Sequence, residues 1–151
     1  EKVFKELSAQ RVSVWYKRWH TLHPETREWQ MRIARMVHEQ GWVAEGMHFR
    51  KRFFPGGPNK KNAPPNHTIQ GRAAAIMNEA VLKVDAEIPH GKWSQWTGLF
   101  LQVHDQLALY VPEDRAEEAA KIIERCMYAE VEGMPIPPGD IMITRDWAEQ
   151  G

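Results

Sequence analysis

The sequence has a single cysteine and no excess of charge of either sign. Its 151 residues include 20 basic and 20 acidic side chains, which gives a formal net charge of zero. One thiol makes no internal disulfide, so a disulfide-stapled fold is excluded, and Cys126 is expected to pack inside a helix beside Ile122 and Ile123. Because the net charge is zero, any nucleic-acid partner has to be inferred from how the charges are distributed.

Long apolar stretches are also absent. No run approaches the roughly 20 residues that a membrane-spanning helix needs. The chain does not open with the basic segment and short apolar run of a secretory leader. We therefore expect a cytoplasmic protein with no membrane partner. The composition, 42% hydrophobic and 26% charged, is typical of a globular domain with a core, and we find no internal repeat and no low-complexity tract.

The charges are segregated along the chain. Residues 46–78 contain six basic side chains and no acidic one, whereas residues 113–132 contain seven acidic and three basic ones. A local positive stripe suits contacts with phosphate groups, and a solvated basic loop is the alternative. The six basic residues are Arg50, Lys51, Arg52, Lys60, Lys61 and Arg72.

The first third of the sequence predicts two packed helices and a ribbon. Ser8 is expected to cap the first helix, Pro24 to open the second, and Gly41 to close it. The tryptophans and methionines of both helices are expected in the core. Residues 43–54 read as a strand pair, followed by a loop rich in lysine and proline up to Pro65. Two helical stripes support this, formed by Val12, Trp15, Tyr16 and Trp19 and by Trp29, Ile33, Met36 and Val37.

The remaining sequence predicts helices packed on a small antiparallel sheet. A long helix is expected from Asn66 or Thr68 to about Val84, an amphipathic helix over residues 114–127, and a last strand over residues 141–144. The fold class is therefore α+β, with residues 1–151 as one segment. Within it, residues 1–65 form helices, ribbon and basic loop, and residues 66–151 form the long helix, a hairpin, a further helix and the last strand. Ile69, Ala73, Ile76, Ala80 and Val84 are expected on the buried face of the long helix.

The hairpin is the most informative segment. Leu99, Leu101 and Val103 alternate before a polar His104-Asp105-Gln106 tip, and Leu107, Leu109 and Val111 alternate after it. Alternation indicates half-buried strands, so the polar residues are expected at the turn. A carboxylate on a rigid turn suits metal binding, and an aspartate that only satisfies local backbone donors is the alternative.

This hairpin and the segment Asn66-His67-Thr68-Ile69-Gln70-Gly71-Arg72 together resemble the C-terminal part of family A DNA polymerases. In that family an Asn-x-Pro-Ile-Gln-Gly-Thr-Ala-Ala-Asp segment opens a long palm helix, and a later Val-His-Asp-Glu turn carries a metal ligand. The likeness covers nearly the whole chain. It extends through Tyr16–Pro24, through Gly41-Trp42-Val43 with Arg50-Lys51-Arg52, and to Asp146-Trp147.

The resemblance implies a DNA-directed DNA polymerase of bacterial or phage type, acting in replication or repair on primer–template DNA and deoxynucleoside triphosphates. Two Mg²⁺ ions serve this reaction, and aspartates from two palm segments hold them. Asp105 matches the second aspartate, and no Asp-Tyr-Ser-Gln-Ile-Glu-like segment supplies the first. We therefore expect this chain to be a fragment or split piece that is inactive alone. The missing upstream segment would supply the other aspartate and the nucleotide-binding helix, at the nucleoid or a phage replication site.

The resemblance also implies DNA contacts. Gln70 matches a residue that probes the minor groove at the primer terminus, His104 one near the primer 3′ end, and Asn66 one near the template. Arg50, Arg52, Lys60, Lys61 and Arg72 are candidate phosphate contacts.

Three departures from the family pattern bear on function. Gln106 replaces the usual Glu and leaves its role as a metal ligand in doubt, while Arg72 replaces Thr and Ala75 replaces Asp. A non-catalytic primer–template binding module of the same lineage therefore stays as an alternative. A metal phosphohydrolase built on His104-Asp105 is disfavoured, because the other histidines show no ligand spacing.

Overall fold

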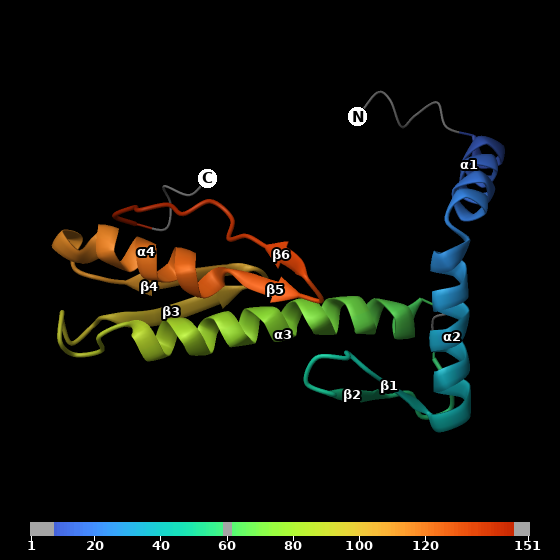
Figure 1. Ribbon diagram of the computed structural model, residues 1–151, viewed down its shortest axis with the longest axis horizontal. Coiled ribbons are helices and arrows are strands. Elements are labelled where there is room, and N and C mark those ends of the chain that lie inside the picture. The colour runs from blue at the N-terminus through green and yellow to red at the C-terminus, as the bar shows by residue number, and fades with distance from the viewer. Residues whose placement is uncertain (1–7, 59–61, 147–151) are drawn as a thin grey trace. The chain divides into compact units, whose positions relative to one another are not determined.

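The computed structural model describes residues 8–58 and 62–146. By internal contacts the chain divides into two compact units, residues 1–71 and residues 72–151, which we describe separately. Both units combine helices with two-stranded antiparallel sheets, which confirms the α+β class (Figure 1). No helix in the described part of the chain is long and apolar enough to cross a membrane.

Two helices open the first unit, and their ends follow local sequence chemistry. Helix α1 (Ala9–Leu22) begins at Ser8, whose side chain accepts a hydrogen bond of 3.3 Å from the Arg11 N–H. Helix α2 (Pro24–Gln40) begins at a proline, which has no backbone N–H; this costs nothing in the first turn of a helix, where N–H groups have no partner within the helix. Gly41, with φ of 78°, caps its C-terminal end. These three predicted boundaries are confirmed.

The apolar stripe of α1 is exposed, so the prediction that its tryptophans lie in the core is wrong. Trp15 is 50% exposed and Trp19 47% exposed, and α1 has no buried residue. The periodicity identified the helix correctly, but the described residues of this unit do not cover its apolar face. Helix α2 does face a core, with Ile33 and Val37 buried and Trp29 and Met36 partly buried beside them.

The predicted ribbon is present. Strand β1 (Trp42–Ala44) pairs antiparallel with β2 (Lys51–Phe53), and residues 55–58 end the pair in a turn rich in proline and glycine. Val43 is fully buried and Phe54 is 8% exposed, and both join Ile33 and Val37 in the core of this unit. The ribbon is therefore anchored to α2 through one face while β2 itself stays exposed.

Helix α3 (Ala63–Glu87) starts three or more residues before the predicted caps. Pro64 and Pro65 lie in its first turn, where backbone N–H groups have no partner within the helix, so the prolines do not interrupt it. The first helical bond shown joins the Asn66 N–H to the Asn62 carbonyl at 3.0 Å. The buried face matches the prediction at Ala80 and Val84, but Ile69 is 61% exposed and Ala73 is exposed, whereas Ala75, which was not expected on that face, is buried.

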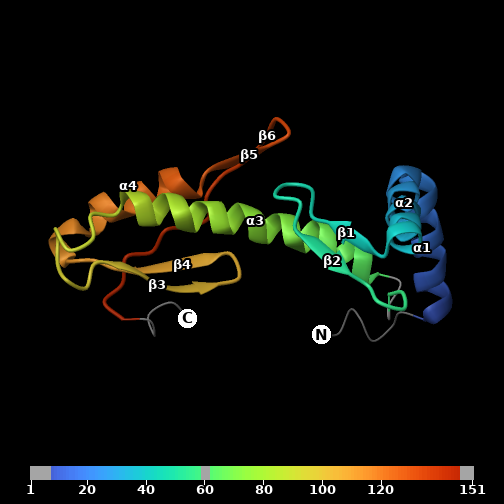
Figure 2. The same ribbon diagram turned by 90° about the horizontal axis from the view of Figure 1, so that it is seen from below.

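The core of the second unit lies between two helices and one hairpin (Figure 2). Strand β3 (Gly98–Val103) pairs with β4 (Gln106–Tyr110), and a short 3-10 turn η2 (Glu113–Arg115) leads into α4 (Ala116–Met127). Burial raises the pKa of the Cys126 thiol, in keeping with its expected packing role. This core is formed by Val84 of α3 and Ile88 just after its end, by Ala119, Ile122 and Cys126 of α4, and by the partly buried Leu99, Leu107, Leu109 and Val111 around the hairpin.

A β-bulge alters the expected alternation in β3. Leu99 lies opposite Leu109, but the register shifts at Phe100, so that Leu101 lies opposite Ala108. Beyond the bulge, Leu101 and Val103 lie on the outer face and are each 39% exposed, contrary to the prediction that they share the inner face with Leu99. A one-residue insertion reverses every later side chain of a strand, and apolar alternation alone does not reveal it.

The C-terminal part differs most from the prediction. Residues 141–144 form no strand, and the hairpin of β5 (Ala129–Val131) and β6 (Met134–Ile136) was not predicted. Its turn residues Glu132 and Gly133 have φ of 53° and 81°, the conformation that two-residue hairpin turns require.

Candidate active site and nucleic-acid interface

The turn of the β3–β4 hairpin presents the predicted metal ligand. His104 and Asp105 form the two-residue turn between paired Val103 and Gln106, and His104 has φ of 53°. A positive φ at the first turn position matches the twist of the two strands. Asp105 is exposed, so its carboxylate faces solvent at the end of a rigid ribbon. The expected position of Asp105 at a strand turn is confirmed.

The described residues do not complete a metal site around this turn. No group of three or more His, Cys, Asp or Glu side chains in residues 8–58 and 62–146 is arranged to hold a metal ion. Mg²⁺ bound by a single carboxylate keeps most of its waters and is held weakly. Beside Asp105, the neighbouring Gln106 has only a neutral amide oxygen.

The first unit gathers four of the predicted DNA contacts. Asn66 and Gln70 are one helical turn apart on α3, and both are exposed. Arg50 and Arg52 lie on and beside β2 of the same unit, and both are exposed as well. Polar helix residues and ribbon cations thus belong to one unit.

Close contact between α3 and the ribbon explains the glycine in the Gln70-Gly71 pair. A Cβ atom at Gly71 would lie only 2.8 Å from the Cβ of Glu45, at the end of β1, and 3.5 Å from the His67 ring. Real Cβ atoms do not approach so closely, and the Glu45 Cβ is too near the backbone to move aside. Glycine at this position therefore permits the ribbon to lie against the helix that carries Gln70.

Glu45 organises the loop between the two ribbon strands. Its side chain is 1% exposed and accepts backbone hydrogen bonds from Met47 at 2.7 Å, His48 at 2.6 Å and Arg50 at 3.3 Å. Burial opposes ionisation of this carboxyl, but the three N–H donors outweigh it and lower its pKa. The loop is thus folded around a buried carboxylate.

His67 lies between the helix and the ribbon. Burial, followed by the positive charge of Arg52, lowers the pKa of this imidazole. Its Nε2 atom is buried with no hydrogen-bond partner. The neutral ring thus stays beside the ribbon cations without adding a charge to them.

Aromatic rings hold two of the ribbon cations in place. The Lys51 Nζ lies 4.0 Å from the centroid of the Trp42 ring, and the Arg52 guanidinium carbon lies 5.4 Å from that of Phe54. Such contacts stabilise cations by about 0.5–1 kcal/mol at exposed sites. The positive charge of β2 is therefore displayed in a fixed arrangement.

The other predicted contacts are placed differently. Arg72 belongs to the second unit, where its Nη2 lies 3.0 Å from the Glu132 Oε1 at the tip of the β5–β6 turn. This ion pair occupies the guanidinium that was expected to contact phosphate. Lys60, Lys61 and Trp147 lie outside the described residues.

Three residues of interest were missed by the sequence interpretation. Glu45 and His67 were not singled out, although Glu45 precedes the loop as the nearest acid to an otherwise acid-free region. Phe49 was also missed, and it has φ of 54° with 74% of its surface exposed. A bulky residue in the left-handed region has no sequence signature, because the conformation is imposed by the contacts of the loop.

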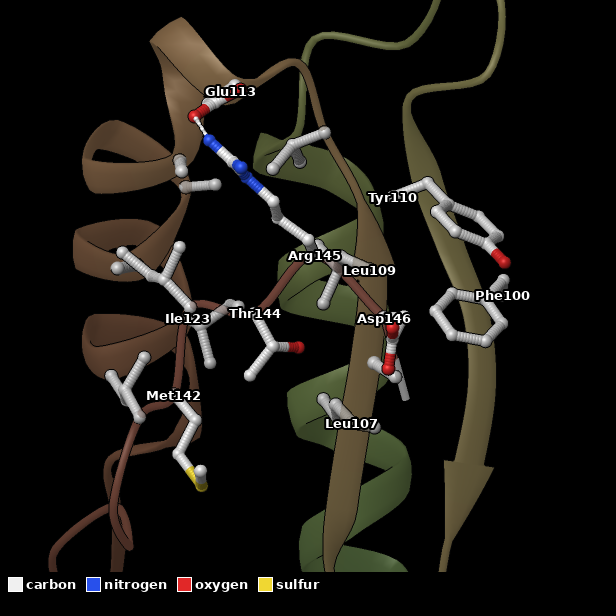
Figure 3. A pocket seen from close by; sticks show the side chains of 17 residues that line it. Phe100, Leu107, Leu109, Tyr110, Glu113, Ile123, Met142, Thr144, Arg145 and Asp146 are labelled. Atoms are coloured by element: carbon white, nitrogen blue, oxygen red, sulfur yellow. Dashed lines mark hydrogen bonds and ion pairs between the residues drawn. The ribbon is translucent and has the colours of Figure 1, made fainter. Parts of the chain in front are cut away.

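The second unit also contains a cavity of about 850 Å³ (Figure 3). Its walls are mostly apolar side chains of β4, α4 and residues 141–144. The Arg145 Nη2 lies 2.9 Å from the Glu113 Oε1 beside it, and Phe100 stacks on Tyr110 with ring centroids 4.2 Å apart. The cavity contains none of the predicted site residues.

Comparisons with known proteins agree with this geometry. The family model described as DNA polymerase family A matches residues 4–149. The chain is 31% identical to a thermostable DNA polymerase I of Thermus filiformis over 143 residues, which cover 88% of this chain and 16% of that protein. It is 29% identical to DNA polymerase I of Aquifex aeolicus, with 81% of this chain and 20% of that protein covered. The chain thus spans about a fifth or less of these relatives.

Proposed function

Because the chain belongs to DNA polymerase family A, we propose that it forms the C-terminal part of a DNA-directed DNA polymerase active site. The observation that carries the proposal is Asp105, exposed at the two-residue turn of a β-hairpin in a chain matched by the family model almost throughout. The proposed reaction is template-directed nucleotidyl transfer.

In this proposal Asp105 contributes one carboxylate to a magnesium site completed by polymerase residues outside this chain. The bound ions would stabilise negative charge that develops during phosphoryl transfer. Rigid mounting matters, because a ligand oxygen has to be held within about 0.5 Å of its productive position. The pairing of Val103 with Gln106 on either side of the turn supports such a mounting.

The first unit is proposed to hold the primer–template. Arg50 and Arg52 would bind backbone phosphates, an interaction independent of sequence and weakened by salt. Gln70 and Asn66 offer amide donors, and minor-groove acceptors common to A·T and G·C pairs suit a donor that tests pair shape without reading sequence. His104 would lie near the primer end.

A chimera tests the proposal. Residues 4–149 of this chain replace the matched region of the Thermus filiformis polymerase, and primer extension is measured with magnesium present. We expect extension by the chimera and its loss in Asp105→Ala. Asp114→Ala serves as the matched control, because Asp114 is an exposed acid of the same unit with only a 3.7 Å contact to Arg115.

The second candidate function is a primer–template binding module without catalysis. Gln106, where the resembled motif has a carboxylate, favours it. A folded chimera that binds primer–template in fluorescence anisotropy but extends no primer, before and after Gln106→Glu, would establish this alternative and refute catalysis.

A further inference from the structure

The loop between β1 and β2 holds one aromatic residue in an unfavourable conformation. Phe49 has φ of 54°, a backbone region that is unfavourable for a residue with a Cβ. The residue is also 74% exposed, so its ring forgoes the stabilisation that burial of an aromatic side chain provides. Residues held under strain persist only where the surrounding structure determines them, and they cluster at functional sites.

Glu45 determines the conformation of the loop that carries Phe49. The buried carboxylate binds the N–H groups on both sides of Phe49, those of His48 and Arg50, together with that of Met47. A backbone bond of 3.3 Å from the Glu45 N–H to the Arg50 carbonyl closes the base of the loop. The Phe49 ring is therefore presented to solvent by a preorganised loop.

The charges around the ring indicate what it contacts. Arg50, Lys51 and Arg52 follow Phe49 directly and are exposed, and residues 46–78 contain no acid. The nearest acid, Glu45, is buried and accepts hydrogen bonds from backbone donors; its Oε1 also lies 4.0 Å from the Arg50 Nε, and the Arg50 side chain stays 49% exposed. An aromatic platform beside a row of cations is the arrangement that binds single-stranded nucleic acid, with phosphates on the cations and a base on the ring.

We propose that Phe49 is a stacking residue for an unpaired base of a DNA strand whose phosphates are bound by Arg50 and Arg52, which lie on the same face of the ribbon, whereas Lys51 points to the other face. The inference rests on the proposed function, because it assigns the ribbon to a DNA strand. It specifies an unpaired or terminal base, since the faces of paired bases inside a duplex are covered by their neighbours.

The test uses the full 151-residue chain and fluorescence anisotropy with a labelled ten-nucleotide single strand and a blunt duplex. Phe49→Gly removes the ring and also relieves the positive φ. We expect it to weaken single-strand binding at least about fivefold, the lower limit for one stacked base, and to leave duplex binding unchanged. Its unfolding midpoint in urea should stay equal or rise, which a ring needed for packing would not allow.

Two further variants separate stacking from general effects. Phe49→Tyr keeps an aromatic face and should restore single-strand affinity. Phe53→Ala removes another aromatic side chain of the same ribbon, 64% exposed, and should not change that affinity. A 5-iodouracil base in the single strand should cross-link to Phe49 on irradiation, as mapped by mass spectrometry.

The outcomes distinguish the two proposals. A wild-type chain that binds neither DNA at low salt refutes the DNA role of the ribbon, and stacking with it. Salt-sensitive DNA binding that is equal in wild type and Phe49→Gly refutes stacking alone. Binding to phosphatidylserine vesicles that depends on Phe49, with single-strand binding that does not, would assign the loop to an anionic lipid surface and overturn the inference.

Discussion

Replacing Glu45 with alanine should release the loop that carries Phe49. The substitution removes the acceptor of two short hydrogen bonds, 2.6 and 2.7 Å, and of a longer one of 3.3 Å. A hydrogen bond to a charged group contributes about 1.5–3 kcal/mol, and water partly replaces the acceptor because His48 and Arg50 are exposed. We therefore expect a loss of about 3 kcal/mol in local stability, roughly a 150-fold change in an opening equilibrium.

Amide hydrogen exchange measures this loss directly at residues 47, 48 and 50. Their protection should fall by about two orders of magnitude in Glu45→Ala, while Glu39→Ala, an exposed acid of α2, should leave it unchanged. Protection within threefold of wild type at all three amides would refute the role assigned to Glu45. The pKa of Glu45 is lowered in the folded state. The contribution of this carboxylate to the free energy of unfolding is therefore full above pH 4.5, the ordinary pKa, and is lost as the pH falls through the folded pKa.

Three further predictions concern the rest of the chain. Gly71→Ala should destabilise the first unit by about 1 kcal/mol in urea unfolding, because a Cβ 2.8 Å from Glu45 costs more by overpacking than the helix gains from alanine; equal or greater stability would contradict the close contact. Both ring nitrogens of His90 face oxygen acceptors, Nδ1 the Thr97 carbonyl at 3.2 Å and Nε2 the Asp85 carbonyl at 2.9 Å, and these carbonyls raise its pKa. The contribution of His90 to the free energy of unfolding should be full below pH 6.5, the ordinary pKa of histidine, and should be lost as the pH rises through the folded pKa. His90→Gln should remove this pH dependence from the urea midpoint. Glu132→Asn should stabilise the β5–β6 hairpin by about 0.5 kcal/mol, because relief of the positive φ outweighs an ion pair in which Glu132 is 78% exposed and Arg72 33% exposed; a lower melting temperature would refute this.

Local chemistry accounts for the parts of the fold that the sequence predicted. Ser8, Pro24 and Gly41 fix helix ends through groups within a few residues, and the polar tip at Asp105 fixes a two-residue turn in the same way. Such signals need no knowledge of the tertiary structure. For the same reason the position of the candidate metal ligand was predictable from the sequence alone.

Nonlocal pairing accounts for two of the errors, at Phe100 and Arg72, and unrecognised local chemistry accounts for two others, at the start of α3 and in the Glu45 loop. The register shift at Phe100 depends on how β3 pairs with β4, and the extended start of α3 depends on Pro64 and Pro65 being tolerated in a first turn. The Glu45 loop was missed because its defining contact joins a buried side chain to backbone N–H groups, which no spacing rule encodes. Arg72 was expected to contact phosphate because its pairing with Glu132, 60 positions away along the chain, is not apparent from the sequence.

The exposed stripe of α1 shows what a periodic pattern does and does not report. Val12, Trp15 and Trp19 recur at the spacing of a buried helix face, yet each is 47–50% exposed in the structure. Periodicity indicates that a face is suited to burial, and it does not identify the residues that cover it. The chain spans 16–20% of the matched relatives, and within the described residues the stripe of α1 is a face suited to burial that stays uncovered.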